Sequence, residues 1–216
     1  EVDSAVLAVW TTRQLWFDGV VNGMVFGLLA LGVVLVYRST RVINLAVGNM
    51  GLPATGLMAL LVINYNFPYW LALPIALAVG IAVGALIERA VIRRLFDAPR
   101  VIVLVATIGI GQLMQAVLAS YPDLERTRGQ RFPAPLTFIW DDVLGLRITG
   151  PKLTIIVLVP LLAVGLSWFL NRTVFGQTVQ ASATNADLAR LSGIDPKMVQ
   201  LFVWTIAGLL ATISLL

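Results

Sequence analysis

The stretch Gly19-Val-Val-Asn-Gly-Met-Val-Phe-Gly-Leu-Leu-Ala-Leu-Gly-Val-Val-Leu-Val-Tyr37 contains no charged residue and decides the fold class. Further uncharged stretches follow at 42–87, 101–122, 153–171 and 198–216. A helix needs about 20 apolar residues to cross the hydrocarbon core of a bilayer, so the longest stretch can cross twice. The sequence therefore predicts an all-α, polytopic membrane helix bundle with six spans at about 19–37, 42–63, 69–87, 101–121, 153–170 and 198–216.

The composition supports this class, because 59% of the residues are hydrophobic and only 12% are charged. A soluble domain of this size carries about a quarter of its residues as charged side chains. The last segment is apolar as far as Leu216. We therefore expect residues 1–216 to form a single transmembrane domain whose C-terminal part is missing. Residues 1–18 lack the pattern of a signal peptide.

Several kinds of chemistry are excluded by residue types. The chain has no cysteine and no histidine, so we expect no disulfide and no metal site of the usual zinc or haem kind. The net charge is +4, but the basic residues lie in loops between the spans, so no nucleic-acid partner is expected. No span has an ionisable residue at its centre, which argues against a proton relay or a voltage sensor.

The basic residues also predict the orientation. Nine of them lie in loops 38–41, 88–100 and 171–197, and six lie on the opposite side of the membrane. Cytoplasmic loops carry the excess of Lys and Arg, so these three loops are predicted to be cytoplasmic and the N-terminus to lie outside. Small residues repeat every four positions at Gly19, Gly23 and Gly27 and at Gly80 and Gly84, which indicates close helix packing of a general kind.

The second predicted span combines residues that weaken a helix with two amides. These residues are Asn44, Gly48, Asn49, Gly51, Pro53 and Gly56. Proline lacks a backbone donor, so the helix can be interrupted at membrane depth and present backbone groups to a substrate. The alternative is a kink that packs against neighbouring helices. The fourth span carries Gln112 and Gln115 on one face, where they either join helices or border a water-filled path.

Loop 171–197 contains a polar segment, 176–194, with the periodicity of a short amphipathic helix. Gly193 is predicted to end this helix, and Asp195-Pro196 to begin the next one, with Pro196 in the first helical position. The segment lacks the Lys/Arg-rich face and the aromatic residues of a helix that lies on lipid. A soluble partner that docks against it is therefore the better explanation.

Four stretches, in this order along the chain, resemble the permease subunits of ATP-binding-cassette (ABC) importers for branched-chain amino acids, the high-affinity leucine/isoleucine/valine type. They are Gly27-Leu-Leu-Ala-Leu-Gly-Val-Val-Leu-Val-Tyr37, Ile43-Asn-Leu-Ala-Val-Gly48, Ala98-Pro-Arg100 with Ala106-Thr-Ile-Gly109, and the segment 181–194. Permeases of this family continue for about two more spans than this chain contains.

The resemblance implies a permease in the bacterial cell membrane that is not itself an enzyme. Its partners would be a second permease subunit, identical or homologous, an extracytoplasmic substrate-binding protein, ABC ATPase subunits and membrane lipid. The partners would use the ATP, because the chain has no phosphate-binding Gly-x-x-x-x-Gly-Lys-Ser/Thr motif and is expected to bind no cofactor. Segment 181–194 would be the coupling helix, with the contact residues Ala183, Ala186, Leu188, Leu191 and Gly193. The path for a branched-chain or related amino acid would be bordered by Asn44, Gly48, Asn49, Gly51, Pro53, Gln112 and Gln115.

The chain departs from the family pattern in two places. Where relatives commonly read Asn-Phe-Ala-His-Gly followed by an acidic residue, this chain has Asn44-Leu-Ala-Val-Gly48-Asn49, which leaves the identity of the substrate open. In the loop, Gln177, Gln180 and Thr184 stand where relatives often have two arginines and a glutamate, so we expect a less charged ATPase contact.

Two other classes remain open from the residues alone. An ion-coupled secondary transporter of a small polar solute would make use of the interrupted second span. A membrane scaffold protein would need only the glycine faces. The loop helix distinguishes these classes, because only the importer gives it a function.

Overall fold

The computed structural model describes the chain except residues 1, 97, 122–133, 135, 137 and 144–145, and except the side chains of 2–12, 141–143 and 186. The long helices are α1 (Val2–Thr40), α4 (Tyr69–Ala90), α5 (Arg100–Ala119), α6 (Gly150–Arg172) and α9 (Pro196–Leu215). The shorter helices are α2 (Val47–Met50), α3 (Leu52–Ala59), α7 (Val174–Thr184) and α8 (Ala186–Leu191), with a π-helical turn η1 (Leu60–Asn64) and a 3₁₀ turn η2 (Ile92–Leu95).

Six helical segments of the described chain are long and apolar enough to cross a membrane, which confirms the predicted bundle. They are Arg13–Thr40, Val47–Asn64, Tyr69–Leu95, Arg100–Ala119, Gly150–Arg172 and Pro196–Leu215. The second segment begins five residues later than predicted. Arg41 adopts a positive φ of 56°, and the chain reaches Val47 before it becomes helical again.

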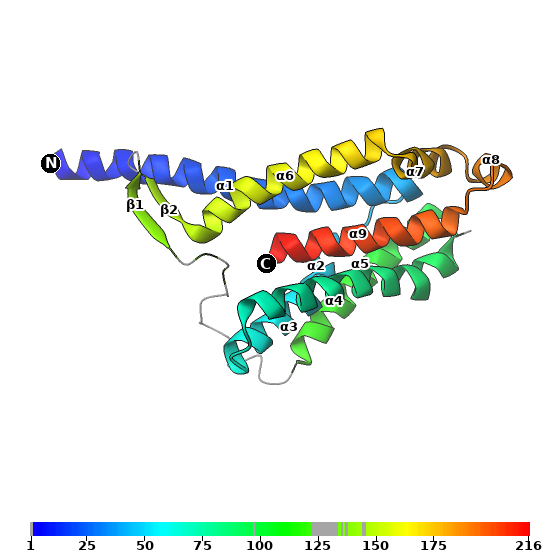
Figure 1. Ribbon diagram of the computed structural model, residues 1–216, viewed down its shortest axis with the longest axis horizontal. Helices are drawn as coiled ribbons and strands as arrows, with labels where there is room; N and C mark the ends of the chain where they lie inside the picture. Colours follow the sequence, from blue (N-terminus) through cyan, green and yellow to red (C-terminus); the bar gives the residue numbers. More distant parts are fainter. Residues whose placement is uncertain (1, 97, 122–133, 135, 137, 144–145) are drawn as a thin grey trace.

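The bundle is elongated, with α7 and α8 at one end and the N-terminus and a small hairpin at the other (Figure 1). α1 and α6 run side by side along one long edge, and α4 and α5 lie on the opposite side with α2 and α3. α9 runs between the two groups and packs most extensively against α4 and α1. We call the end that carries α7 and α8 the loop end.

Glycines make the contact between α4 and α9 close. A β-carbon on Gly80 or Gly84 would collide with Thr212 or with the Trp204 carbonyl, and one on Gly208 would collide with the Gly80 carbonyl. The predicted packing role of Gly80 and Gly84 is therefore confirmed. The other predicted glycine face, on α1, is different: its three glycines are exposed, with nothing within 4 Å of an added β-carbon.

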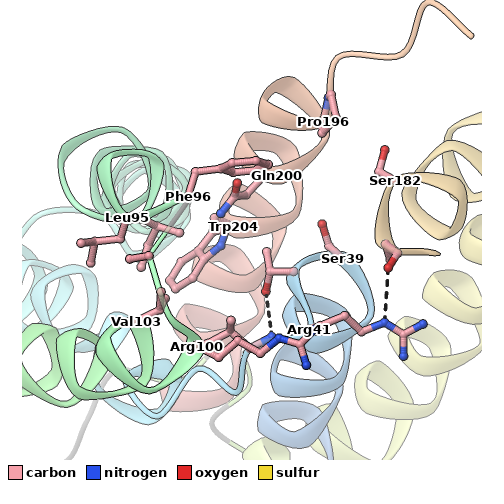
Figure 2. Close-up of a pocket in the computed structure, with 15 residues that line it drawn as sticks. Ser39, Arg41, Leu95, Phe96, Arg100, Val103, Ser182, Pro196, Gln200 and Trp204 are labelled. Carbon is pink, nitrogen blue, oxygen red and sulfur yellow. Dashed lines mark hydrogen bonds between the residues drawn. The ribbon is translucent and has the colours of Figure 1, made fainter. Parts of the chain in front are cut away.

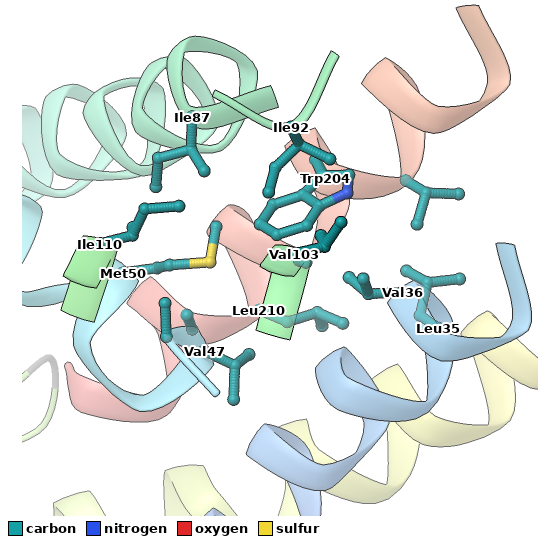
Figure 3. Close-up of a cluster of buried hydrophobic side chains, with 14 of the residues drawn as sticks. Leu35, Val36, Val47, Met50, Ile87, Ile92, Val103, Ile110, Trp204 and Leu210 are labelled. Atoms are coloured by element: carbon teal, nitrogen blue, oxygen red, sulfur yellow. The ribbon is translucent and has the colours of Figure 1, made fainter. Parts of the chain in front are cut away.

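The main apolar core lies where α1, α2, α4, α5 and α9 meet (Figure 3). Its labelled members include Leu35 of α1, Met50 of α2, Ile87 of α4, Ile110 of α5 and Trp204 of α9. Trp204 is only 1% exposed and is the largest of the fully buried side chains. An aromatic ring of this size contributes strongly to burial, so it ties α9 to the rest of the bundle.

A short antiparallel hairpin was not predicted from the sequence. It pairs β1 (Ile139–Val143) with β2 (Leu146–Thr149). Lys152 forms an ion pair with Asp18 of α1 at 2.6 Å, and the Arg147 backbone N–H donates to Gln14 Oε1 at 2.9 Å. The Arg147 contact fixes the hairpin to α1, and the Lys152 ion pair fixes the start of α6, which directly follows the hairpin. Three arginines used to predict the orientation, Arg126, Arg128 and Arg131, lie outside the described residues.

Candidate coupling surface and transport path

The chain turns back sharply after α6. Thr173 lies between the helices, and its Oγ1 accepts a hydrogen bond from the Gly176 backbone N–H at 3.1 Å. Gly176 is buried against the carbonyl of Leu170, where a β-carbon would collide. Gln180 Nε2 donates to the same carbonyl at 3.2 Å. Glycine at position 176 therefore lets α7 fold tightly against the end of α6.

The predicted single helix over 176–194 is wrong in detail, because the chain forms two helices. Asn185 separates them with an extended backbone of φ −152° and ψ 105°. Its Oδ1 accepts from the backbone N–H groups of Asp187 and Leu188, at 3.0 and 3.1 Å. Asparagine at this position caps the start of α8 and competes with continuation of α7.

The predicted end of the loop helix is confirmed. Gly193 has a φ of +81°, which side chains disfavour, and the Ile194 N–H donates back to the Ala189 carbonyl at 3.0 Å. Asp195 then caps α9, because its Oδ1 accepts from the Lys197 N–H at 2.9 Å. Pro196 occupies the first turn of α9, as the sequence predicts.

α8 presents an apolar pair to solvent. Leu188 is 60% exposed and Leu191 is 85% exposed, whereas Ala189 between them is buried. Ala183 precedes them on α7, is half-buried, and its carbonyl accepts from Arg41 Nε at 3.4 Å. The side chain of Ala186 lies outside the described residues. We call the exposed pair, Leu188 and Leu191, the coupling surface.

α8 and the start of α9 also contact the loop that follows α4. The Arg190 guanidinium lies 5.6 Å from the centre of the Phe96 ring, and Lys197 Nζ lies 6.0 Å from it. Arg190 also pairs with Asp187 at 3.3 Å. No local pattern in the sequence points to Phe96, because its partners Arg190 and Lys197 lie about a hundred residues away in the chain.

Asn44 is held inside the bundle rather than in a free site. It is 1% exposed, its Oδ1 accepts from the Ala46 N–H at 2.9 Å, and its Nδ2 lies 3.2 Å from the sulfur of Met50. The neighbouring Leu45 N–H donates to Thr107 Oγ1 of α5 at 3.2 Å. Asn44 therefore shapes the entry of the chain into α2.

The predicted interruption of the second span lies at Gly51, between α2 and α3. A β-carbon there would come within 2.6 Å of the Ala211 carbonyl of α9. The Pro53 carbonyl accepts a hydrogen bond from the Tyr121 hydroxyl at 2.8 Å. This side of the break is packed and hydrogen-bonded.

The remaining predicted path residues lie on the outer side of α2 and α5. Gly48 has open space around an added β-carbon, and Asn49 is half-buried against Gly111. Gln112 and Gln115 are both exposed. The structure therefore divides the predicted path into an inward group (Asn44, Gly51 and Pro53) and an outward group (Gly48, Asn49, Gln112 and Gln115).

These features define a multi-pass helical membrane protein with a folded helical loop at one end of its bundle. Residues 15–214 match the family model described as branched-chain amino acid transport system / permease component. The chain belongs to this family.

Curated relatives carry two kinds of name. The chain is 30% identical over 190 residues to a probable branched-chain amino acid transport permease protein LivH of Methanocaldococcus jannaschii, covering 87% of this chain and 60% of that protein. It is 28% identical over 187 residues to the fructose import permease protein FruF of Bifidobacterium longum, covering 87% and 50%. It is 26% identical over 207 residues to the high-affinity branched-chain amino acid transport system permease protein BraD of Pseudomonas aeruginosa, covering 91% and 67%.

The chain thus spans between half and two thirds of the length of these relatives. No solved structure matches the chain.

Proposed function

We propose that the chain is the membrane-spanning permease subunit of an ABC importer that carries branched-chain or related amino acids, driven by ATP hydrolysis in partner subunits. The observation that carries this proposal is the coupling surface. Leu188 and Leu191 lie exposed at the tip of the loop end, outside the apolar spans. Exposed leucines on a helix are suited to fill a hydrophobic groove of a soluble partner.

The contacts of α8 explain how motion of such a partner could reach the membrane. α8 is capped by Asn185, ends at the Gly193 turn, and contacts Phe96 through Arg190. The turn leads directly into α9, which packs along α4 and α1. Packed helices shift as units, so a movement of α8 would also move α9 within the bundle.

The transport path is proposed to run along the outward group. An amide exposed within a span is unfavourable in hydrocarbon, so Gln112 and Gln115 need another helix or a water-filled path beside them. A second permease subunit, identical or homologous, placed against this face would supply the neighbouring helix and would enclose a water-filled path between the two subunits. An extracytoplasmic binding protein would deliver the solute to the path.

The orientation belongs to the same proposal. The loop end would face the cytoplasm of a bacterial cell, with the N-terminus outside and the bundle in the cell membrane. Arg41, Arg89, Arg94 and Arg100 lie exposed at or near this end, in agreement with the positive-inside rule.

The experiment replaces the coupling surface. Leu188→Asp and Leu191→Asp place a charge where a hydrophobic groove is expected, and Ala186→Trp adds bulk at the start of α8. ATPase subunits should co-purify poorly with these variants, and ATP-driven uptake should fall in proportion. Val174→Asp is the matched control, because Val174 is an 80% exposed apolar residue of the same loop but of α7.

Normal co-purification and uptake in all three α8 variants would remove the coupling assignment. Uptake that depends on an ion gradient and does not depend on ATP would instead favour the secondary transporter.

A further inference from the structure

A cavity of about 280 Å³ lies inside the loop end of this single chain (Figure 2). It is partly open and is lined by the end of α1, the turn η2, the start of α5, the end of α7 and the start of α9. We call it the end pocket. Its lining includes neither the outward group of path residues nor the coupling surface.

Three buried polar side chains line the end pocket, and each has an atom without a hydrogen-bond partner in the described part of the chain. These atoms are Ser182 Oγ, Gln200 Oε1 and Trp204 Nε1. The residues are 8%, 5% and 1% exposed. Buried polar groups in native proteins are almost always hydrogen-bonded, so three unpaired groups around one cavity call for partners inside it, which water or a bound ligand can supply.

The remaining lining has two parts. The charged residues among the described lining are both basic, Arg41 and Arg100. Arg41 uses its Nε for the Ala183 carbonyl, which leaves its terminal nitrogens for another acceptor. Apolar side chains, among them Ile92 and Val103, form the remaining wall.

Each part selects one feature of a ligand. Guanidinium groups bind carboxylates, and the Trp204 indole N–H can donate to the same anion. Gln200 Oε1 can accept from a donor on the ligand, and the Ser182 hydroxyl can do either. The apolar wall suits an aliphatic body. The volume lies just below the range typical of drug-sized ligands, about 300–1,000 Å³, so a small metabolite fits.

We propose that the end pocket binds a small aliphatic carboxylate with a hydrogen-bond donor on the adjacent carbon, such as an aliphatic α-amino acid or 2-hydroxy acid. A ligand there bridges four helices and η2. It would hold the loop that carries the coupling surface in one position relative to α9. This last effect rests on the proposed function: an intracellular ligand of this kind would slow ATP-driven transport.

Binding is tested on the permease purified with its permease and ATPase partners, but without the extracytoplasmic binding protein, in lipid nanodiscs, by titration calorimetry without ATP. The probes are L-leucine, 2-hydroxy-4-methylpentanoate, and isopentylamine, which keeps the aliphatic body and the amine but lacks the carboxylate. The first two probes should bind with one site per permease chain, and isopentylamine should not. Binding of leucine but not of the hydroxy acid would show that the end pocket selects amino acids. Equal binding of both acids would show that it recognises the carboxylate and the neighbouring hydrogen-bond donor.

Trp204→Phe and Ser182→Ala each remove one unpaired group while leaving most of the side-chain volume. Each should weaken binding about tenfold, the loss of one hydrogen bond to an anion. Because the Ser182 hydroxyl has no partner in the described chain, Ser182→Ala should change thermal stability without ligand little, whereas Trp204→Phe also removes part of a buried ring and is compared as folded protein only. Trp168→Phe is the control, since Trp168 lies 64% exposed on α6. Arg100→Gln should reduce affinity more than Arg172→Gln, which changes an exposed arginine outside the lining.

Absence of saturable binding at millimolar probe concentrations would overturn the proposal, as would equal binding by Trp204→Phe, Ser182→Ala and the Trp168→Phe control. Because binding is measured without ATP, its failure is separate from failure of the proposed function. If the α8 variants retain normal coupling while the probes still bind, the importer proposal fails and the end pocket stands.

Discussion

Gly80 of α4 and Gly208 of α9 lie back to back where the two helices cross, so closely that a β-carbon on Gly208 would collide with the Gly80 carbonyl. Gly84 continues the contact one turn further, against the Trp204 carbonyl. Close approach of backbones is how helices associate strongly in a bilayer, where apolar side chains gain little over lipid. The close spacing of α4 and α9 therefore depends on these glycines.

Replacing Gly208 by leucine should separate α9 from α4. The added side chain meets backbone rather than a flexible neighbour, so the variant should lose about 1–3 kcal/mol or more of stability. Thermal unfolding in detergent measures the effect. Gly165→Leu is the matched control, because Gly165 of α6 has nothing within 4 Å of an added β-carbon. Equal stability of the two variants would contradict the close contact.

Glu88 provides a second test, near the loop end of α4. Its side chain is 0% exposed, and its Oε1 accepts from Arg93 Nε at 3.1 Å. Removing the arginine in Arg93→Met leaves a buried carboxylate without its partner, a change that destabilises by about 3–5 kcal/mol when both groups are fully buried. Arg93 is 35% exposed, so we expect a smaller loss. Arg94→Met, at an exposed neighbouring arginine, should change unfolding little.

The double variant Glu88→Met/Arg93→Met separates charge from packing. If an unpaired carboxylate is the cause, removing it should restore much of the stability lost in Arg93→Met. A double variant that unfolds as early as Arg93→Met would show that the arginine acts through packing instead.

The sequence predicted those features of the fold that are determined by residues close together in the chain. Uncharged stretches located all six spans, and Asp195-Pro196 located the start of α9, because these signals act within a few residues. The break at Asn185 was missed because its side chain competes with a helix that the surrounding pattern favours. The end pocket could not be predicted, since Arg41, Ser182 and Trp204 meet only after four separated segments pack together.

The orientation can be measured directly, because the chain has no natural cysteine. A single cysteine at Asn185, which lies exposed between α7 and α8, should resist an impermeant thiol reagent added to intact cells. A cysteine at Trp140, exposed on β1 at the opposite end, should react. Both sites should react after the membrane is permeabilised. Labelling of the Asn185 position from outside would reverse the orientation and place the coupling surface on the wrong side for an ATPase.

The last prediction separates the transport path from the packing of the second span. Gly51→Leu would push a side chain into the Ala211 backbone, so loss of transport in that variant would report damage to the bundle. Gly48 is different, because a β-carbon there meets nothing within 4 Å. Gly48→Leu should therefore leave the thermal stability of this chain nearly unchanged, and co-purification of the second permease subunit shows whether the complex still assembles.

If the outward group borders the path, Gly48→Leu should still reduce uptake severalfold, because the bulky side chain narrows the path beside Asn49. Gly48→Ala should have a smaller effect on uptake than Gly48→Leu, since it adds a single methyl group. Uptake, assembly and unfolding measured on the three variants give the answer. Normal uptake in a stable, assembled Gly48→Leu variant would show that the solute passes elsewhere.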